Sequence, residues 1–165
     1  MKIAKKDQYH GAALLQIAQD DTHTTINGFT FRGEKSHNAF GVNEVGVYFK
    51  YCAVPRGAYT EYVFNFSEQE LDEIDKLHAK YSKAVVALIC IKAGQVCCFP
   101  YQQLLDLRAE REKTKGRPEK TSTILVTIPD GKNFRVYMNY PGTKGKSLGV
   151  FKVPRRAFPK VIFDQ

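Results

Sequence analysis

An apolar run of eight residues, Ala-Val-Val-Ala-Leu-Ile-Cys-Ile at positions 84–91, most constrains what this chain can fold into. Both sets of alternate side chains are apolar, as expected for a central β-strand that other elements cover on each face. The run is far shorter than the roughly 18–20 residues that a helix needs to cross a bilayer. We therefore expect a layered domain with this strand at its centre and without a membrane span.

Alternating patterns predict further strands on both sides of this run. Residues 45–52 and 60–66 each alternate between two unlike faces, which is the period of a strand. A Pro-Arg-Gly turn at residues 55–57 separates them and predicts that they pair as a hairpin. The full set of predicted strands is 45–52, 60–66, 84–91, 95–99, 122–128, 133–140 and 149–153.

Helical patterns occur at residues 7–20, 67–81 and 100–112. The second begins with Ser67 and Glu70 at the spacing of a capping box, in which each side chain bonds the backbone amide of the other residue. Phe29 and Phe31 predict a short strand after the first helix. Residues 32–43 are polar and contain glycine, which predicts a long loop.

The order of these elements predicts an α+β fold, with a mixed or antiparallel sheet of hairpins packed against about three helices. A chain of 165 residues has the usual size of one domain, so residues 1–165 are expected to fold as a single unit. Apolar residues make up 43% of the chain and charged residues 25%. These are ordinary values for globular proteins and exclude a disordered or fibrous class.

Charge is distributed unevenly along the chain. Residues 1–100 contain 11 Lys and Arg against 11 Asp and Glu, whereas residues 101–165 contain 14 against 6. The net charge of +8 therefore comes entirely from the second section. We expect a neutral α/β core section followed by a basic, β-rich section, and such asymmetry indicates an anionic partner.

The basic section predicts nucleic-acid binding. Its cations alternate with aromatic residues such as Phe134, Tyr137 and Phe151. Cations contact phosphates and exposed aromatics stack on unpaired bases, so we expect DNA or RNA as the partner. The predicted binding residues are Lys132, Arg135, Lys144, Lys146, Lys152, Arg155, Arg156 and Lys160. Two alternatives remain: the same aromatics form a core under a merely basic surface, or the surface binds an acidic protein.

The order helix, three strands, helix, strand over residues 7–91 resembles the core order of restriction-endonuclease-like nucleases. The resemblance is one of element order alone. It implies a divalent metal, Mg²⁺ or Mn²⁺, held by carboxylates beside a lysine.

The usual nuclease pattern of acid, any residue, lysine is broken in this chain, because Val63 stands two residues after Glu61. The candidate catalytic set is then Glu44, Lys50 and Glu61, with the lysine on the neighbouring predicted strand. The alternative is that Lys50 and Glu61 form a cross-strand ion pair on the exposed face of the predicted hairpin.

Two other motifs give weaker indications of function. The segment Gly-Thr-Lys-Gly-Lys-Ser at residues 142–147 ends like a phosphate-binding loop, but Tyr140 stands where the motif needs its first glycine and a strand follows instead of a helix. Cys97 and Cys98 are adjacent in a predicted strand and point to opposite faces, so they cannot easily share one metal. We expect reduced, buried thiols, no resident cofactor and a cytoplasmic protein, since the N-terminus has no apolar stretch typical of a signal peptide.

Overall fold

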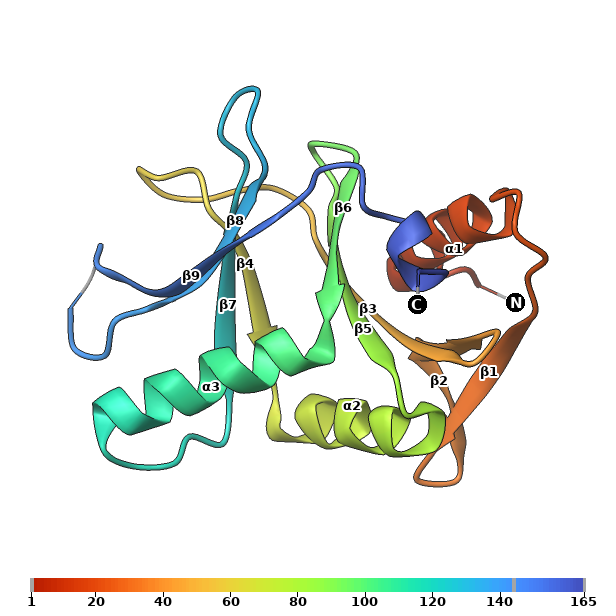
Figure 1. Ribbon diagram of the computed structural model, residues 1–165, viewed down its shortest axis with the longest axis horizontal. Coiled ribbons are helices and arrows are strands. Elements are labelled where there is room, and N and C mark those ends of the chain that lie inside the picture. The colour runs from red at the N-terminus through yellow and green to blue at the C-terminus, as the bar shows by residue number, and fades with distance from the viewer. Residues whose placement is uncertain (1, 144, 165) are drawn as a thin grey trace.

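The apolar run forms strand β5 (Ala84–Cys90), in which every residue is buried. The computed structural model describes residues 2–143 and 145–164, and within them it contains two β-sheets and three α-helices (Figure 1). This arrangement confirms the predicted α+β fold with about three helices. No helix in the described part of the chain is long and apolar enough to cross a membrane.

In the first sheet, β5 is an inner strand between β3 and β6. The strand order of this sheet is β1-β2-β3-β5-β6, where β3 and β5 are parallel and the other neighbours are antiparallel. The strands other than β5 are β1 (Ile26–Phe31), β2 (Glu34–Val42), β3 (Val45–Cys52) and β6 (Gln95–Pro100). The parallel pair is possible because helix α2 (Glu68–Tyr81) returns the chain between β3 and β5.

The second sheet is antiparallel and has the order β4-β7-β8-β9. Its strands are β4 (Tyr62–Phe66), β7 (Ser122–Thr127), β8 (Phe134–Asn139) and β9 (Ser147–Val153). In Figure 1 this sheet lies on the left and the first sheet on the right. Three of the four strands of the second sheet therefore come from the basic section, residues 101–165.

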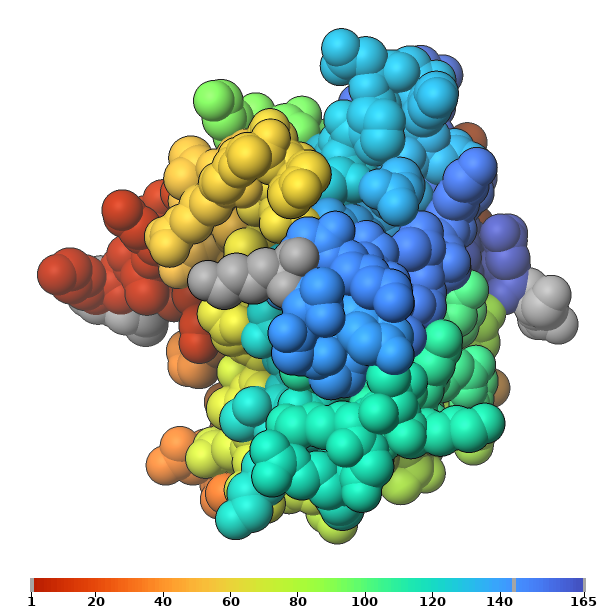
Figure 2. Space-filling view, turned by 90° about the vertical axis from the view of Figure 1, so that its left-hand side faces the viewer, coloured from red at the N-terminus to blue at the C-terminus, as the bar shows by residue number. Residues whose placement is uncertain are grey.

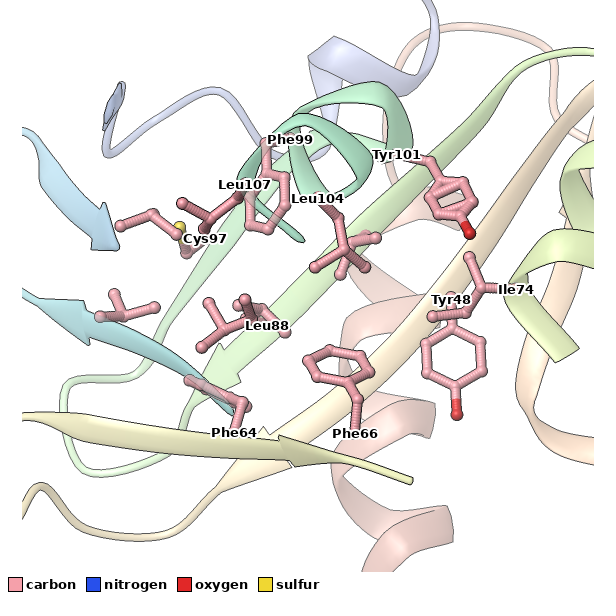
Figure 3. Packing of buried hydrophobic residues seen from close by; sticks show 14 of the residues in the cluster. Tyr48, Phe64, Phe66, Ile74, Leu88, Cys97, Phe99, Tyr101, Leu104 and Leu107 are labelled. Atoms are coloured by element: carbon pink, nitrogen blue, oxygen red, sulfur yellow. The ribbon is translucent and has the colours of Figure 1, made fainter. Parts of the chain in front are cut away.

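Both faces of the first sheet are covered. Helix α1 (Lys5–Ala18) and the short helix η1 (Lys160–Ile162) pack on one face, around Phe49, Val85 and Ala87. Helix α2, helix α3 (Tyr101–Lys115) and the second sheet cover the other face. Figure 3 shows Phe64 and Phe66 pointing from β4 into this shared core.

The predicted hairpin of residues 45–52 and 60–66 is wrong. Strand β3 pairs with β2 and β5, whereas β4 pairs with β7 in the other sheet, from Tyr62 opposite Val126 to Phe66 opposite Ser122. All three aromatic side chains of β4 point into the core and are buried. Burying that face requires β4 to lie over the first sheet rather than beside β3.

The predicted loop at residues 32–43 is mostly strand β2. Arg32 and Gly33 both have positive φ, 50° and 81°, and form a two-residue turn between β1 and β2. Such turns usually carry Asn or Gly at the first position, so the arginine gave no hairpin signal. The polar residues from Glu34 to Asn38 lie at the outer end of this hairpin, where burial is slight.

Strand β2, which was not predicted, takes the place in the first sheet that was expected for β4. Because β2 is present and β4 belongs to the second sheet, the elements of the first sheet still follow as helix, three strands, helix and strand. The order that resembles the nuclease core is therefore kept, with different strands from those expected.

Candidate functional site

A groove of about 1230 Å³ lies over the outer face of the second sheet. Its walls come from the loop before β4, the β7–β8 turn and the segment before β9. Figure 2 shows these three segments gathered on one face, in yellow, cyan and blue. The groove is mixed in charge, because Lys92, Arg135 and Arg155 line it together with Glu61 and Asp130.

Strand register places four polar side chains in one row across the second sheet. Thr127 is opposite Arg135, and Arg135 is opposite Lys152. Glu61 precedes Tyr62, whose partner is Val126, so Glu61 stands across from Thr127 at the end of β4. Neighbouring strands are about 4.8 Å apart, so the row spans roughly 14 Å from the carboxylate to the lysine strand.

Glu61 is tied to the floor of the groove by Tyr137. The Tyr137 hydroxyl donates a hydrogen bond to Glu61 Oε2. Burial and the adjacent Glu61 carboxylate raise the pKa of Tyr137 well above its ordinary value, so the phenol stays protonated and remains a donor. The carboxylate is thereby held at a fixed place in the groove.

Thr127 has no hydrogen-bond partner for its hydroxyl among the described residues. Its side chain lines the groove, and only 9% of the residue is exposed. A buried polar group without a partner costs about 1–3 kcal/mol, so such groups are uncommon away from functional sites. The Thr127 oxygen is itself buried, beneath the groove surface and next to the Tyr137 hydroxyl.

The exposed aromatic at the groove is Tyr59, which sequence reasoning missed. Tyr59 lines the groove and is 65% exposed. A large exposed aromatic beside a polar groove is unusual and is suited to stacking on a planar ligand. Its sequence signal is weak, because it occurs in the neutral section, two residues after Gly57 and away from the basic residues.

The aromatics predicted to stack mostly form the core instead. Phe134 is fully buried, Phe151 packs against the same core, and Tyr137 is only 4% exposed. Tyr140 is half-buried, with Lys146 Nζ 4.0 Å from the centre of its ring. The alternative of a basic surface over an aromatic core therefore describes most of these residues.

The eight predicted basic residues do not form one surface. Arg135 and Arg155 line the groove, Lys152 lies beside Arg135, and Lys132 is exposed in the β7–β8 turn. Lys160 lies elsewhere, because its Nζ pairs with Asp20 at the end of α1, 3.2 Å away. Lys146 and Arg156 are exposed, and Lys144 lies outside the described residues.

The candidate catalytic residues Glu44, Lys50 and Glu61 are not brought together. Glu44 precedes β3 and lies six residues before Lys50, about 20 Å along the strand. Glu61 belongs to the groove. The expected Lys50–Glu61 ion pair is also absent from the described residues, because Lys50 Nζ lies 2.6 Å from Glu70 Oε2 on α2.

A second polar cluster is formed by Glu70, which pairs with Lys50, and the neighbouring Glu73, at the point where β2 and β3 separate. The ladder between these strands ends at the Ala39–Tyr48 pair. Beyond it, the Ser36 hydroxyl donates a hydrogen bond to Glu73 on α2. Glu73 is 6% exposed, and burial raises the pKa of its carboxyl.

No group of three or more His, Cys, Asp or Glu side chains arranged to hold a metal ion occurs within residues 2–143 and 145–164. The four cysteines are free thiols. Burial raises the pKa of Cys90 and of Cys98 to about 12, which keeps both in the weakly coordinating thiol form.

No family model matches the chain, and no match was found among curated proteins or among solved structures.

Proposed function

We propose that this protein binds nucleic acid through the groove on the second sheet. The observation that carries the proposal is the row formed by Thr127, Arg135 and Lys152 across the second sheet, beside Arg155. Fixed cations on neighbouring strands neutralise backbone phosphates and release counterions. The exposed Tyr59 at the same groove adds a surface on which a base can stack.

Binding of labelled single-stranded DNA and RNA over a series of salt concentrations tests this proposal. We expect affinity to fall steeply with salt, with a slope of about −0.7 in log K against log salt for each phosphate contact. Arg135→Ala and Lys152→Ala should each weaken binding and reduce the slope by about 0.7, because each removes one contact.

Lys160→Ala is the matched control, since it removes one positive charge at the ion pair with Asp20, away from the groove. It should leave the slope unchanged. Absence of binding at low salt would contradict the proposal and favour the alternative of an acidic protein partner. Binding that neither groove variant weakens would show that the contact surface lies elsewhere.

A metal-dependent nuclease is the second candidate, favoured by the cluster at Lys50. The cluster lies on the first sheet, whose element order resembles the nuclease core. Its acidic side chains are Glu70 and Glu73 on α2. Magnesium is often bound by one or two carboxylates together with substrate phosphates. Glu73 would supply such a carboxylate when ionised, whereas both oxygens of Glu70 already bond Ser67, Tyr48 and Lys50.

Incubation with DNA or RNA and either metal tests this candidate. Cleavage that Lys50→Ala and Glu73→Gln abolish would support a site at this cluster. Cleavage that these variants leave intact but Glu61→Gln abolishes would place the chemistry in the groove instead. Absence of cleavage with both metals would reject the nuclease candidate and leave the binding proposal standing.

We also propose a cytoplasmic location. The support is that all four cysteines are free and that three of them are buried, as is usual where thiols are kept reduced.

A further inference from the structure

One group in the groove, the Glu61 carboxylate, has no role in holding phosphate. A carboxylate repels phosphate, yet Glu61 lies in the groove beside the cations. The unpartnered Thr127 hydroxyl lies next to it in the same row. Phosphate binding explains the cations at one end of the row. The carboxylate at the other end suits a ligand that donates hydrogen bonds.

We propose that this end of the groove binds one unpaired base through its Watson–Crick edge and prefers guanine. The inference rests on the proposed nucleic-acid binding. Arg135 and Lys152 hold the backbone phosphate, while Glu61 contacts the base. The charge order along the row, from carboxylate to hydroxyl to two cations, matches the order from base edge to phosphate in a nucleotide.

Guanine is preferred because an ionised carboxylate only accepts hydrogen bonds. Guanine presents two adjacent donors on this edge, its ring N1–H and its exocyclic amino group. Thymine and uracil present one N–H between two carbonyl oxygens, which repel the carboxylate. The donated hydrogen bond from Tyr137 fixes Glu61 through Oε2 and directs the carboxylate toward this edge.

The base must be unpaired, because the Watson–Crick edge is occupied in a duplex. Tyr59 supports this requirement. The residue is 65% exposed at the same groove, and its ring can stack on an extruded base.

Fluorescence anisotropy with short labelled oligonucleotides tests the inference. The probes are an oligothymidylate, the same strand with one central guanosine, and that second strand paired with its complement. We expect the single guanosine to raise affinity about five-fold or more, as for a good pair of hydrogen bonds to one base. The duplex should bind more weakly than the guanosine-containing strand.

Glu61→Gln should bring the ratio of the two single-strand affinities close to one, because the amide places a donor against the guanine donors. Glu34→Gln is the matched control, since Glu34 is exposed in the β1–β2 hairpin of the other sheet. It should leave the ratio unchanged, and thermal unfolding checks that each variant is folded.

Failure of this inference differs from failure of the proposed function. Equal affinity for all three probes, or a guanosine preference that survives Glu61→Gln, would overturn the inference while binding itself stands. If no probe binds at low salt, the proposed function fails and the inference fails with it.

Discussion

Lys50 on β3 pairs with Glu70 on α2, and the Nζ and Oε2 atoms lie 2.6 Å apart. The same carboxylate accepts a hydrogen bond from the Tyr48 hydroxyl, and its other oxygen caps the backbone amide of Ser67. Burial acts to raise the pKa of Glu70, but the hydrogen bonds from Lys50 and Ser67 outweigh it and the pKa lies below its ordinary value of 4.5. One glutamate thus joins the start of α2 to the first sheet.

Replacing Lys50 should destabilise the protein through this junction. Lys50→Met keeps the apolar stem but leaves Glu70 half-buried without its cation, which should lower the free energy of unfolding by about 1–3 kcal/mol at neutral pH. Because the folded pKa of Glu70 is depressed, this stabilisation is present above pH 4.5 and is lost as pH falls through the folded pKa. The difference between wild type and variant should therefore shrink in acid.

Urea denaturation at several pH values measures this difference. Lys113→Met, at an exposed position of α3, is the matched control and should change stability by less than about 0.5 kcal/mol. An equal loss in both variants would contradict a specific role for the Lys50–Glu70 pair.

Glu73 should show the opposite pH dependence. Burial raises the pKa of Glu73 in the folded protein, so the fold favours the protonated form. This contribution to stability is fully present below the unfolded pKa and is lost as pH rises through the folded value. Glu73→Gln keeps an acceptor for the Ser36 hydroxyl without the charge, so its advantage over wild type should be largest at neutral pH.

Denaturation of wild type and Glu73→Gln between neutral pH and about pH 4, near the usual carboxyl pKa, measures this trend. Glu44→Gln, at an exposed glutamate before β3, is the control. A Glu73→Gln advantage that grows as pH falls would show that the sign is wrong.

The four thiols should differ sharply in reactivity. Cys90, Cys97 and Cys98 are buried, and burial raises the pKa of each, whereas Cys52 is partly exposed at the end of β3. Since the thiolate is the reactive form, a disulfide reagent should modify one thiol in the folded protein and all four after unfolding. Cys52→Ser should remove the reactive thiol; a fast reaction that persists in this variant would contradict the burial of the other three.

Gly46 should be intolerant of a side chain because α2 packs directly on it. A Cβ at this position would lie 2.6 Å from Leu77 Cγ, and Leu77 is fully buried. Gly46→Ala should therefore cost about 1–3 kcal/mol, as overpacking does. Gly11→Ala is the matched comparison: nothing lies within 4 Å of its added Cβ, and it should instead stabilise α1 by about 0.5–1 kcal/mol. Thermal unfolding of both variants compares the two sites.

Local sequence patterns predicted most elements well. The capping box at Ser67 and Glu70 is formed, and the helix that follows begins and ends within a residue of expectation. The apolar run at residues 84–91 becomes the buried β5. Amide capping and the alternation of side chains both depend on residues that are close in the chain. Both features can therefore be predicted directly from the sequence.

Partner choice between strands was harder to predict. Residues 60–66 have the expected alternation, but alternation says which face is buried and not which strand lies alongside. The burial of Phe64 and Phe66 between the two sheets decides that β4 pairs with β7. Lys50 thereby faces Glu70 rather than Glu61, and the catalytic set expected from a hairpin does not assemble.

Local periodicity and composition predict the α+β class, the strand and helix positions other than β2, and a positive charge confined to the second section. Which charges share a surface depends on the packing of the strands. Strand pairing aligns Arg135 with Lys152 and Thr127, and it brings Glu61 from the neutral section to the end of that row. Lys160 instead forms an ion pair with Asp20, away from the row. The physical reason is that burying the aromatic faces of both sheets against each other fixes which strands are neighbours, and a count of charges along the chain contains no information about that packing.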